Sequence, residues 1–125
     1  MRAVLDTSVL IADEWPFPDE AAISVASLAE LHFGVQAARE PGERSRRLTR
    51  LGLVEAEFAP LPVDAAIARA WGTLAALSRE RGIQPRRRAM DLLIAATAQM
   101  EKVPLISFDE DLRALADVID LRNGA

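Results

Sequence analysis

An aspartate between two short apolar runs near the N-terminus constrains the fold more than any other feature of the sequence. Residues 3–5 indicate a buried strand, and residues 8–12 indicate the start of a helix. Asp6 then ends the strand and faces the N-terminus of the helix, where open α/β sheets bind ligands. Asp6 could instead be only a helix cap, the commoner role of aspartate before an apolar run. If other acidic residues of the chain reach the same crevice, a ligand-binding role of Asp6 is favoured over a capping role.

Short apolar segments and helical segments alternate along the rest of the chain. A loop containing Pro16 and Pro18 is expected over residues 14–19. Further strands are expected at 21–25, 103–107 and 118–121, with a short or edge strand at 58–63, and helices at 28 to near 41, 43–57, 64–81, 88–101 and 111–116. The strands lack alternation of apolar and polar residues, which is typical of a parallel sheet covered on both faces. We therefore predict an α/β fold: a single domain over residues 1–125, with a central parallel sheet of four to five strands flanked by helices on both faces.

Capping signals mark two of these helices. Ser27 followed by Glu30 has the spacing of a capping box. Asp64 is a good N-cap for the next helix, and Gly82 follows its end in the preferred C′ position. That helix carries an apolar stripe at helical spacing, formed by Ile67, Trp71, Leu74 and Leu77. The stripe is either an ordinary core face or a dimer face.

Composition excludes several classes of protein. The 125 residues are 50% apolar, enough for a core, and contain no cysteine, so disulfides and thiolate metal sites are excluded. Cysteine-free composition fits the cytoplasm, our expected location. Asp6 interrupts the first apolar run, so we expect no signal peptide. No apolar segment is long enough to cross a bilayer, and we expect no membrane partner.

The formal charge of −4 argues at first against a nucleic-acid binder. The objection weakens if four acids share one metal site, because the remaining charges then balance. Nine of the 15 basic residues also lie in two arginine clusters: Arg44, Arg46, Arg47 and Arg50, and then Arg79, Arg81, Arg86, Arg87 and Arg88. These clusters are either solvated helix faces or sites that hold phosphate groups through the planar guanidinium.

Acidic residues fall at comparable places on the predicted elements. They are Asp6, Glu30, Asp91 and Asp109, with Asp111 two residues beyond the last. Strand ends and the first turns of following helices share one edge of a parallel sheet. Each acid also has a structural explanation: Glu30 as part of a capping box, Asp91 as a partner of the helix dipole, and Asp109 or Asp111 as a cap.

Asp91 is the acid least easily explained by local structure. Its neighbours are apolar, so its carboxylate needs a cation or a hydrogen-bond partner, and residues 86–88 offer arginines for this. If the acids converge instead, an all-oxygen set indicates Mg²⁺ or Mn²⁺ rather than Zn²⁺. His32 lies on a different side of its helix from Glu30, so we do not expect it to be a ligand.

Four segments together carry a family resemblance. Residues 4–8, 27–35, 90–98 and 105–112 resemble, in order and spacing, the PIN-domain ribonucleases, and among them the VapC-type toxins of bacterial toxin–antitoxin pairs. The resemblance covers essentially the whole chain. It implies an endoribonuclease dependent on Mg²⁺ (or Mn²⁺), in which Asp6, Glu30, Asp91 and Asp109 are catalytic and hold the metal.

The resemblance also implies accessory residues, namely Thr7, Ser8, Ser107 and Asp111. Two positions depart from the family pattern: Ser107 stands where Thr is commoner, and Leu112 stands in place of Phe. A hydroxyl is kept at the first, and only packing should change at the second. Because Asp109 and Asp111 are so close in sequence, either one is a candidate for the fourth acid.

The partners implied are an RNA substrate and a small VapB-type antitoxin whose tail lies in a groove and blocks the acidic site. Homodimers or toxin–antitoxin hetero-oligomers are expected. Candidate RNA contacts are Arg44, Arg47, Arg86, Arg87 and Arg88. Two alternatives are a non-catalytic PIN fold that binds RNA or protein, and a receiver-type phosphoacceptor domain. The second is disfavoured because Asp6 lacks a neighbouring acid and Lys102, the only lysine, precedes the strand at Leu105.

Overall fold

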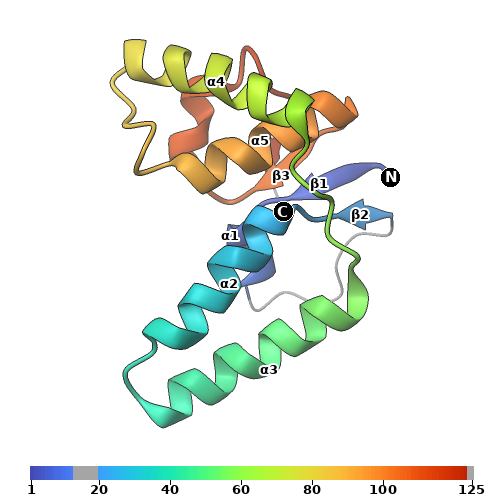
Figure 1. The fold of residues 1–125 in the computed structure, drawn as a ribbon, viewed down its shortest axis with the longest axis vertical. Helices are drawn as coiled ribbons and strands as arrows, with labels where there is room; N and C mark the ends of the chain where they lie inside the picture. The colour runs from blue at the N-terminus through green and yellow to red at the C-terminus, as the bar shows by residue number, and fades with distance from the viewer. Residues whose placement is uncertain (13–19, 124–125) are drawn as a thin grey trace.

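The computed structural model describes residues 1–12 and 20–123 (Figure 1). In chain order its elements are β1 (Ala3–Leu5), α1 (Thr7–Leu10), β2 (Ala21–Ala22), α2 (Val25–Ala37), α3 (Pro41–Glu57), α4 (Ala65–Glu80), α5 (Ala89–Glu101), β3 (Leu105–Ser107), the 3₁₀ helix η1 (Glu110–Leu115) and β4 (Leu121–Asn123). The predicted α/β fold is confirmed, although α2, α3, α4 and α5 follow one another without an intervening strand. The proline-containing loop predicted at 14–19 lies outside the described residues.

The strands form one parallel sheet in the order β2-β1-β3-β4. In β1, Val4 pairs with Leu105 and Leu5 pairs with Ile106 of β3. Because β1 and β3 are adjacent and parallel, their carboxyl ends lie at the same edge of the sheet. The residues that follow them, including Asp6, are therefore brought together at that edge.

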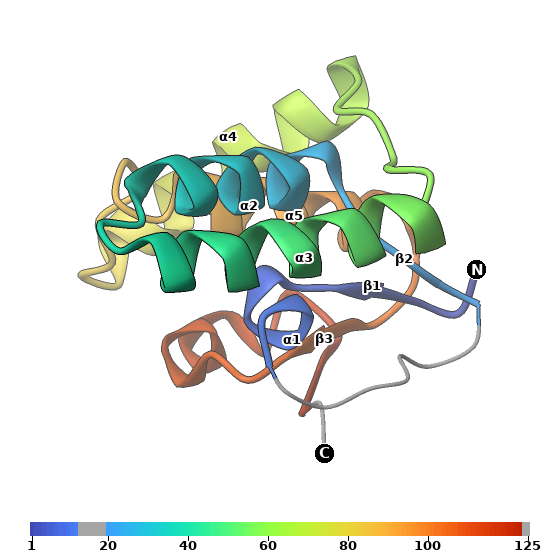
Figure 2. The same cartoon turned by 90° about the horizontal axis from the view of Figure 1, so that it is seen from below.

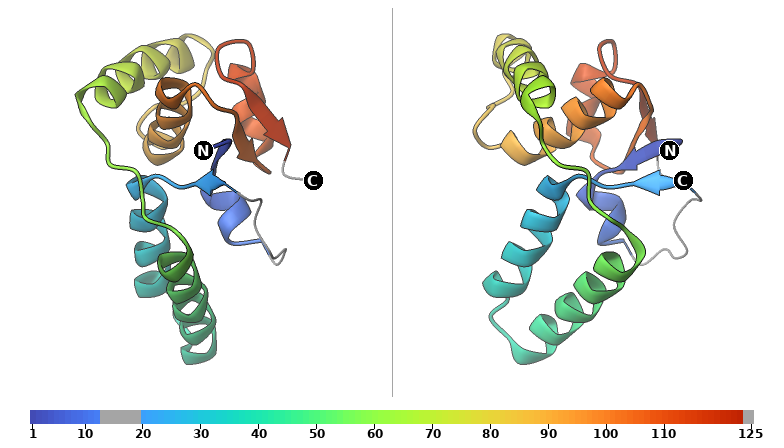
Figure 3. Two further views of the ribbon diagram at one scale, coloured as in Figure 1. Left: turned by 90° about the vertical axis from the view of Figure 1, so that its right-hand side faces the viewer. Right: turned by 45° about the vertical axis from the view of Figure 1, so that its right-hand side comes forward.

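Helices cover both faces of this sheet, as Figures 1 and 3 show. Val4 and Leu105 point into a core built with α4, α5 and η1. Leu5 and Ile106, the next residue of each strand, point into a second core built with α1, α2 and α3. Successive side chains of a strand face opposite sides, so the two central strands, β1 and β3, carry apolar residues at successive positions up to Leu5 and Ile106. The edge strand β4 differs, since Arg122 and Asn123 are exposed. The predicted two-sided cover is confirmed for the central strands.

The helices α2 and α3 run side by side as a pair, seen along their length in Figure 2. The N-cap of α2 is Ser24, whose Oγ accepts a hydrogen bond from Ala26 N at 3.0 Å. The capping box predicted for Ser27 and Glu30 is wrong, because Ser24 caps the helix as soon as the chain leaves β2. Ser27 is buried inside α2, and Glu30 lies in its second turn rather than its first.

The predicted boundaries of α4 are confirmed. Asp64 caps the helix, with its Oδ1 accepting from Ile67 N at 2.8 Å. Gly82 follows the helix with φ +80°, a conformation that favours glycine. The apolar stripe lies inside the chain: Ile67 and Leu74 are buried, and Trp71 and Leu77 pack against the same core. The stripe therefore packs as a core face within the chain, as the first alternative predicts.

The last predicted strand, at 118–121, lies later in the structure. Val118 N and Ile119 N donate to Leu115 O, so the chain is still leaving η1 there and β4 begins only at Leu121. In the segment 58–63, Leu61 forms a single bridge to Ser24, which fits the expected short edge segment. Among the described residues, we find no helix whose length and apolar character would let it span a bilayer.

Candidate active site

Asp6 lies directly after β1 and is 2% exposed. It occupies the N-cap position of α1, yet its side chain makes no capping hydrogen bond. Its Oδ2 accepts from Ser107 Oγ at 2.7 Å and from Ser8 Oγ at 2.9 Å. Its Oδ1 is buried and has no hydrogen-bond partner among the described residues. The cap explanation is therefore wrong for this side chain, and a buried carboxylate oxygen is left available to a ligand.

The hydroxyl groups around Asp6 connect the ends of β1 and β3. Ser107 Oγ, which donates to Asp6, accepts from Asp109 N at 2.9 Å. Ser8 Oγ accepts from Phe108 N at 3.0 Å. The two serines thus hold the backbone after β3 against the Asp6 carboxylate, and both belong to the predicted accessory residues.

Glu30 reaches the same edge from α2. Thr7 Oγ1 donates to Glu30 Oε1 at 2.6 Å and lies 3.1 Å from Ser27 Oγ. The Thr7 hydroxyl therefore orients the Glu30 carboxylate from the first residue of α1. Ser27, expected from the sequence only as a cap, contributes a buried hydroxyl next to this pair. No local sequence pattern identifies that role, because Thr7 is twenty positions away in the chain.

Asp91 lies in the first turn of α5, as predicted. Arg88 Nη1 donates to Asp91 Oδ2 at 2.9 Å and to Asp109 Oδ2 at 2.6 Å. The expected pairing of Asp91 with a nearby arginine is thus confirmed for Arg88. The signal was the i, i+3 spacing of Arg88 and Asp91, which places both at the start of one helix.

Asp109 and Asp111 differ in exposure. The Asp109 side chain is 22% exposed and that of Asp111 is 72% exposed, and both contact Arg88. Asp109 also caps η1, with its Oδ1 accepting from Asp111 N at 3.0 Å. The more enclosed Asp109 faces the other acids, and Asp111 lies at the outer rim.

The four acids act on one another electrostatically. Burial raises the pKa of Glu30, the Thr7 hydrogen bond opposes this, and the charges of Asp91 and Asp6 raise the pKa further. Burial also raises the pKa of Asp91, the hydrogen bond from Arg88 opposes this, and the charges of Asp6 and Asp109 add to the rise. The structure therefore gathers Asp6, Glu30, Asp91 and Asp109 into one negatively charged neighbourhood, although they come from four separate segments.

This neighbourhood has the composition of a site for a hard cation. Its donors are carboxylate and hydroxyl oxygens, the ligands that Mg²⁺ and Mn²⁺ prefer. In the present arrangement no three acidic or histidine side chains within residues 1–12 and 20–123 are positioned together to hold an ion. Arg88 takes one oxygen each of Asp91 and Asp109, while Asp6 Oδ1 has no partner among these residues. The oxygen set fits such an ion, provided that Arg88 gives up these two contacts.

His32 lies apart from the acids. Its Nε2 is 3.3 Å from Glu55 Oε1 on the exposed surface of the α2–α3 pair. This position agrees with the expectation that His32 is not a ligand.

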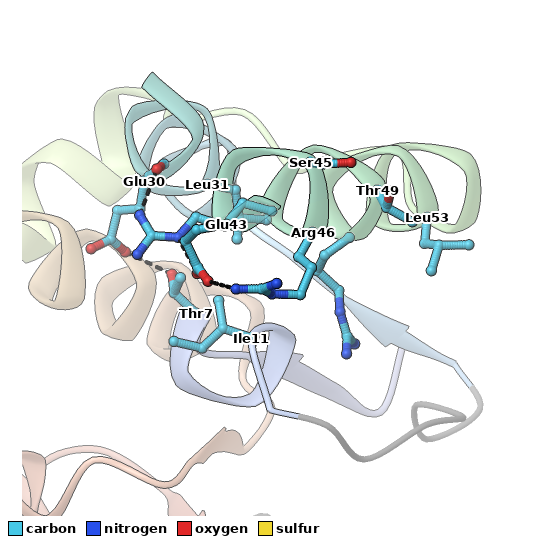
Figure 4. A pocket seen from close by; sticks show the side chains of 12 residues that line it. Thr7, Ile11, Glu30, Leu31, Glu43, Ser45, Arg46, Thr49 and Leu53 are labelled. Carbon is cyan, nitrogen blue, oxygen red and sulfur yellow. Dashed lines mark hydrogen bonds and ion pairs between the residues drawn. The ribbon is translucent and has the colours of Figure 1, made fainter. Parts of the chain in front are cut away.

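A groove of about 820 Å³ leads away from Glu30 between α1, α2 and α3 (Figure 4). Thr7 and Glu30 lie at one end, and Thr49 and Leu53 lie toward the other. Ile11 is 61% exposed and Leu53 is 48% exposed, so the groove presents apolar side chains to solvent. Charged side chains line the groove as well, namely Glu30, Glu43, Arg46, Arg47 and Arg50, so its surface is mixed apolar and charged.

The arginine clusters are used in different ways. Arg44 Nη2 donates to Ala38 O at 2.7 Å, and Arg47 Nη1 donates to Gly34 O at 2.6 Å, so both hold α3 against the end of α2. Arg86 and Arg87 are exposed and make no side-chain hydrogen bond or ion pair within the described part of the chain. Arg86 and Arg87, in the loop that follows α4, are therefore available to a ligand.

Comparisons with known proteins agree with the fold. A sequence model of the PIN domain matches residues 3–118. Ribonuclease VapC5 of Mycobacterium tuberculosis is 44% identical over 119 residues, which span 90% of this chain and 86% of that protein. Ribonuclease VapC4 of the same organism is 37% identical over 124 residues, spanning 94% of this chain and 93% of that protein.

Among solved structures, VapBC-5 from Mycobacterium tuberculosis, a member of the VapBC family of toxin–antitoxin systems, aligns with a TM-score of 0.81 and 41% identity over 98% of each chain. Because the PIN model matches almost the whole chain, the alternative of a receiver-type phosphoacceptor domain is excluded. Fold, family match and identity to these relatives lead to one conclusion: the chain belongs to the PIN-domain family, within its VapC group.

Proposed function

We propose that this protein is a metal-dependent endoribonuclease and the toxin of a toxin–antitoxin pair, with residues 1–125 acting as one PIN domain. The observation that carries the proposal is the buried Oδ1 of Asp6, which has no hydrogen-bond partner within residues 1–12 and 20–123, in a group of carboxylates that act on one another electrostatically. The names of the relatives, ribonucleases VapC5 and VapC4, support the choice of RNA as substrate.

Asp6 and Asp91 are the proposed direct ligands of Mg²⁺ or Mn²⁺, and Glu30 and Asp109 complete the site or hold its waters. When bound, such an ion polarises a phosphodiester and lowers the pKa of a bound water. The chain's own residues supply the positioning. Ser8 and Ser107 fix one oxygen of Asp6, so that the other faces the site, and Thr7 fixes Glu30.

The test is RNA cleavage by Asp6→Asn and Asp91→Asn, with Asp120→Asn as a matched control. Asp120→Asn is the same substitution at an exposed aspartate, whose side chain forms an ion pair with Arg122 two residues away. Each site variant should lose at least about 100-fold in cleavage rate, because several kcal/mol of transition-state stabilisation depends on the ion. The control should keep its activity, and EDTA should abolish cleavage by every active form.

A cleaving Asp6→Asn variant, or cleavage that resists EDTA, would contradict the proposal. Circular dichroism of each variant checks that the fold is kept. The alternative of a non-catalytic PIN module predicts RNA binding without cleavage in either Mg²⁺ or Mn²⁺. The same assay therefore separates the two functions.

The RNA backbone is proposed to lie along the loop after α4. Arg87 and Arg88 line a shallow depression with Gln84 and Asp111, directly beside the acids. Arg86 and Arg87 are the first candidates for phosphate contacts, since Arg44 and Arg47 are engaged in holding α2 and α3. Arg88 is considered separately below.

The groove from Glu30 to Leu53 is the proposed site of a small VapB-type antitoxin. The similar VapBC-5 protein belongs to a family of toxin–antitoxin systems, which supports a partner of this kind. Leu53→Asp should weaken co-purification with a co-expressed VapB-type antitoxin, because it replaces one of the apolar side chains of the groove, beside Ile11 and Leu31, by a charge. Nuclease activity should persist in that variant, and light scattering of the purified complex would measure the expected homodimer or hetero-oligomer.

A further inference from the structure

We propose that Arg88 is an internal counter-ion of the acidic site and that it competes with the divalent ion for oxygens of Asp91 and Asp109. This inference rests on the proposed metal-dependent function. It assigns Arg88 a role in metal affinity, apart from any contact with RNA.

The contacts of Arg88 converge on carboxylates from two elements. Nη1 donates to Oδ2 of Asp91 and to Oδ2 of Asp109, at 2.9 and 2.6 Å. Nη2 donates to Asp111. One guanidinium therefore bridges the start of α5 and the start of η1, a geometry that its planar set of donors permits.

The position of Arg88 is set by the backbone. It is the N-cap residue of α5, with φ −106° and ψ 18°, and lies one turn before Asp91. Its side chain is 25% exposed, against 82% for Arg2 in a surface pair. Half-buried ion pairs are screened less than exposed ones, so the Arg88 contacts carry more weight than the surface pairs of this chain.

Electrostatic attraction to the carboxylates holds the guanidinium of Arg88 in this position. Asp91 is acted on by the negative charges of Asp6 and Asp109, and Arg88 supplies the opposing positive charge. The hydrogen bonds to Asp91 and Asp109 in turn raise the pKa of Arg88, so it remains a cation throughout the accessible pH range. Without an ion, the acids are stabilised by Arg88.

The carboxylate oxygens that Arg88 contacts belong to proposed ligands of the divalent ion. Oδ2 of Asp91 and Oδ2 of Asp109 are both occupied by one nitrogen of Arg88. A divalent ion that binds these oxygens competes with the guanidinium, because two cations held at the same carboxylate oxygens repel each other. The free energy of ion binding to the wild-type chain therefore includes the cost of breaking the contacts of Arg88 with Asp91 and Asp109.

The experiment measures Mn²⁺ binding by electron paramagnetic resonance to the wild-type chain, Arg88→Gln and Arg87→Gln. Arg87→Gln is the matched control, since it removes the same charge from the adjacent, exposed residue. Arg88→Gln should bind Mn²⁺ about tenfold more tightly than the control, as expected when a charge-assisted competitor is removed. Arg87→Gln should stay within about twofold of the wild type, because an exposed charge is screened.

Thermal melting adds a readout that a merely structural arginine would not give. In EDTA, Arg88→Gln should melt below Arg87→Gln, because its acids have lost their counter-ion. Saturating Mn²⁺ should raise the Tm of Arg88→Gln by more than that of the wild type. A structural arginine would lower the Tm equally with and without Mn²⁺. If Arg88→Gln does not fold in EDTA, Arg88→Lys, which keeps the charge without the planar fork, should show intermediate tightening.

The outcomes separate this inference from the proposed function. Mn²⁺ affinity of Arg88→Gln equal to or below that of Arg87→Gln would overturn the role of Arg88 and leave the metal site standing. Failure of all three proteins to bind Mn²⁺ would overturn the proposed metal-dependent function, and this inference with it.

Discussion

At the scale of single residues, small hydroxyl groups decide how the acids are presented. Ser107 donates to Asp6 at 2.7 Å and accepts from Asp109 N at 2.9 Å, so one side chain couples two of the acids. Ser107 is itself buried. Loss of its hydroxyl would leave both a carboxylate oxygen and a backbone N–H with one partner fewer.

We therefore expect Ser107→Ala to lower the free energy of unfolding by about 1.5–3 kcal/mol, the range for hydrogen bonds to charged groups. Ser107→Thr keeps the hydroxyl and should stay close to the wild type. Urea denaturation measures the first effect, and Mn²⁺ titration should show weaker binding only for the alanine variant. Equal stability of the alanine and threonine variants would show that the hydroxyl makes no net contribution.

At the scale of elements, α4 illustrates how local signals define a helix. Asp64 satisfies the Ile67 N–H at its start, and Gly82 takes the positive φ at its end. The buried residues between them pack on α5. The ends are therefore encoded locally, while the packing stabilises the middle.

Replacing the cap should destabilise the protein without altering the fold. Asp64→Ala should lower the free energy of unfolding by about 1 kcal/mol, because the Ile67 N–H loses its acceptor, whereas Asp64→Ser keeps an acceptor and should lose less. Chemical denaturation followed by circular dichroism measures both. Equal losses in the two variants would mean that the Asp64 charge, rather than the hydrogen-bond acceptor, matters.

The two arginine clusters belong to different elements and should behave differently. In an Asp6→Asn background, which holds RNA uncut, we expect Arg86→Ala with Arg87→Ala to reduce the slope of log affinity against log salt by about 1.4–1.8. Arg44→Ala with Arg47→Ala should instead lower the Tm, since both arginines bind carbonyls at the end of α2. Fluorescence anisotropy at several salt concentrations gives the slope. A reduced slope for the second pair alone would place the RNA on α3.

At the scale of the whole molecule, the sheet separates two cores. Leu74 lies in the core with α4 and α5, and Leu51 lies in the core with α2 and α3. Both side chains are nearly fully buried, at 2% and 3% exposed. The acidic site lies at the sheet edge where helices of both cores begin, so it depends on each of them.

Leu74→Ala and Leu51→Ala should each lower the free energy of unfolding by about 2–5 kcal/mol, through lost burial and a residual cavity. Because the two leucines share no core cluster, the double variant should equal the sum within about 0.5 kcal/mol. Urea unfolding of the three variants measures this. A coupling well above that value would mean that the cores are not independent.

Much of the fold could be predicted from local patterns in the sequence. The strand at 3–5, the cap at Asp64 and the helix end at Gly82 are confirmed, and the strand predicted at 103–107 forms over Leu105–Ser107. The cap at Ser27 was wrong, since a second serine three residues earlier competes for the same role. The last strand was placed too early, because backbone bonds to Leu115 delay it. When two nearby residues are equally good candidates for a cap or a strand end, only contacts with other parts of the chain decide between them.

The sequence alone determined the order of the elements and the presence of acids after β1 and β3, because apolar spacing and turn residues act over a few positions. Only the tertiary structure decided which carboxylates interact, that Asp109 rather than Asp111 faces the others, and that Arg88 binds both. Those relations join residues that are 18 to 101 positions apart, such as Ser107 and Asp6. Their energies depend on burial and distance, which no local pattern contains.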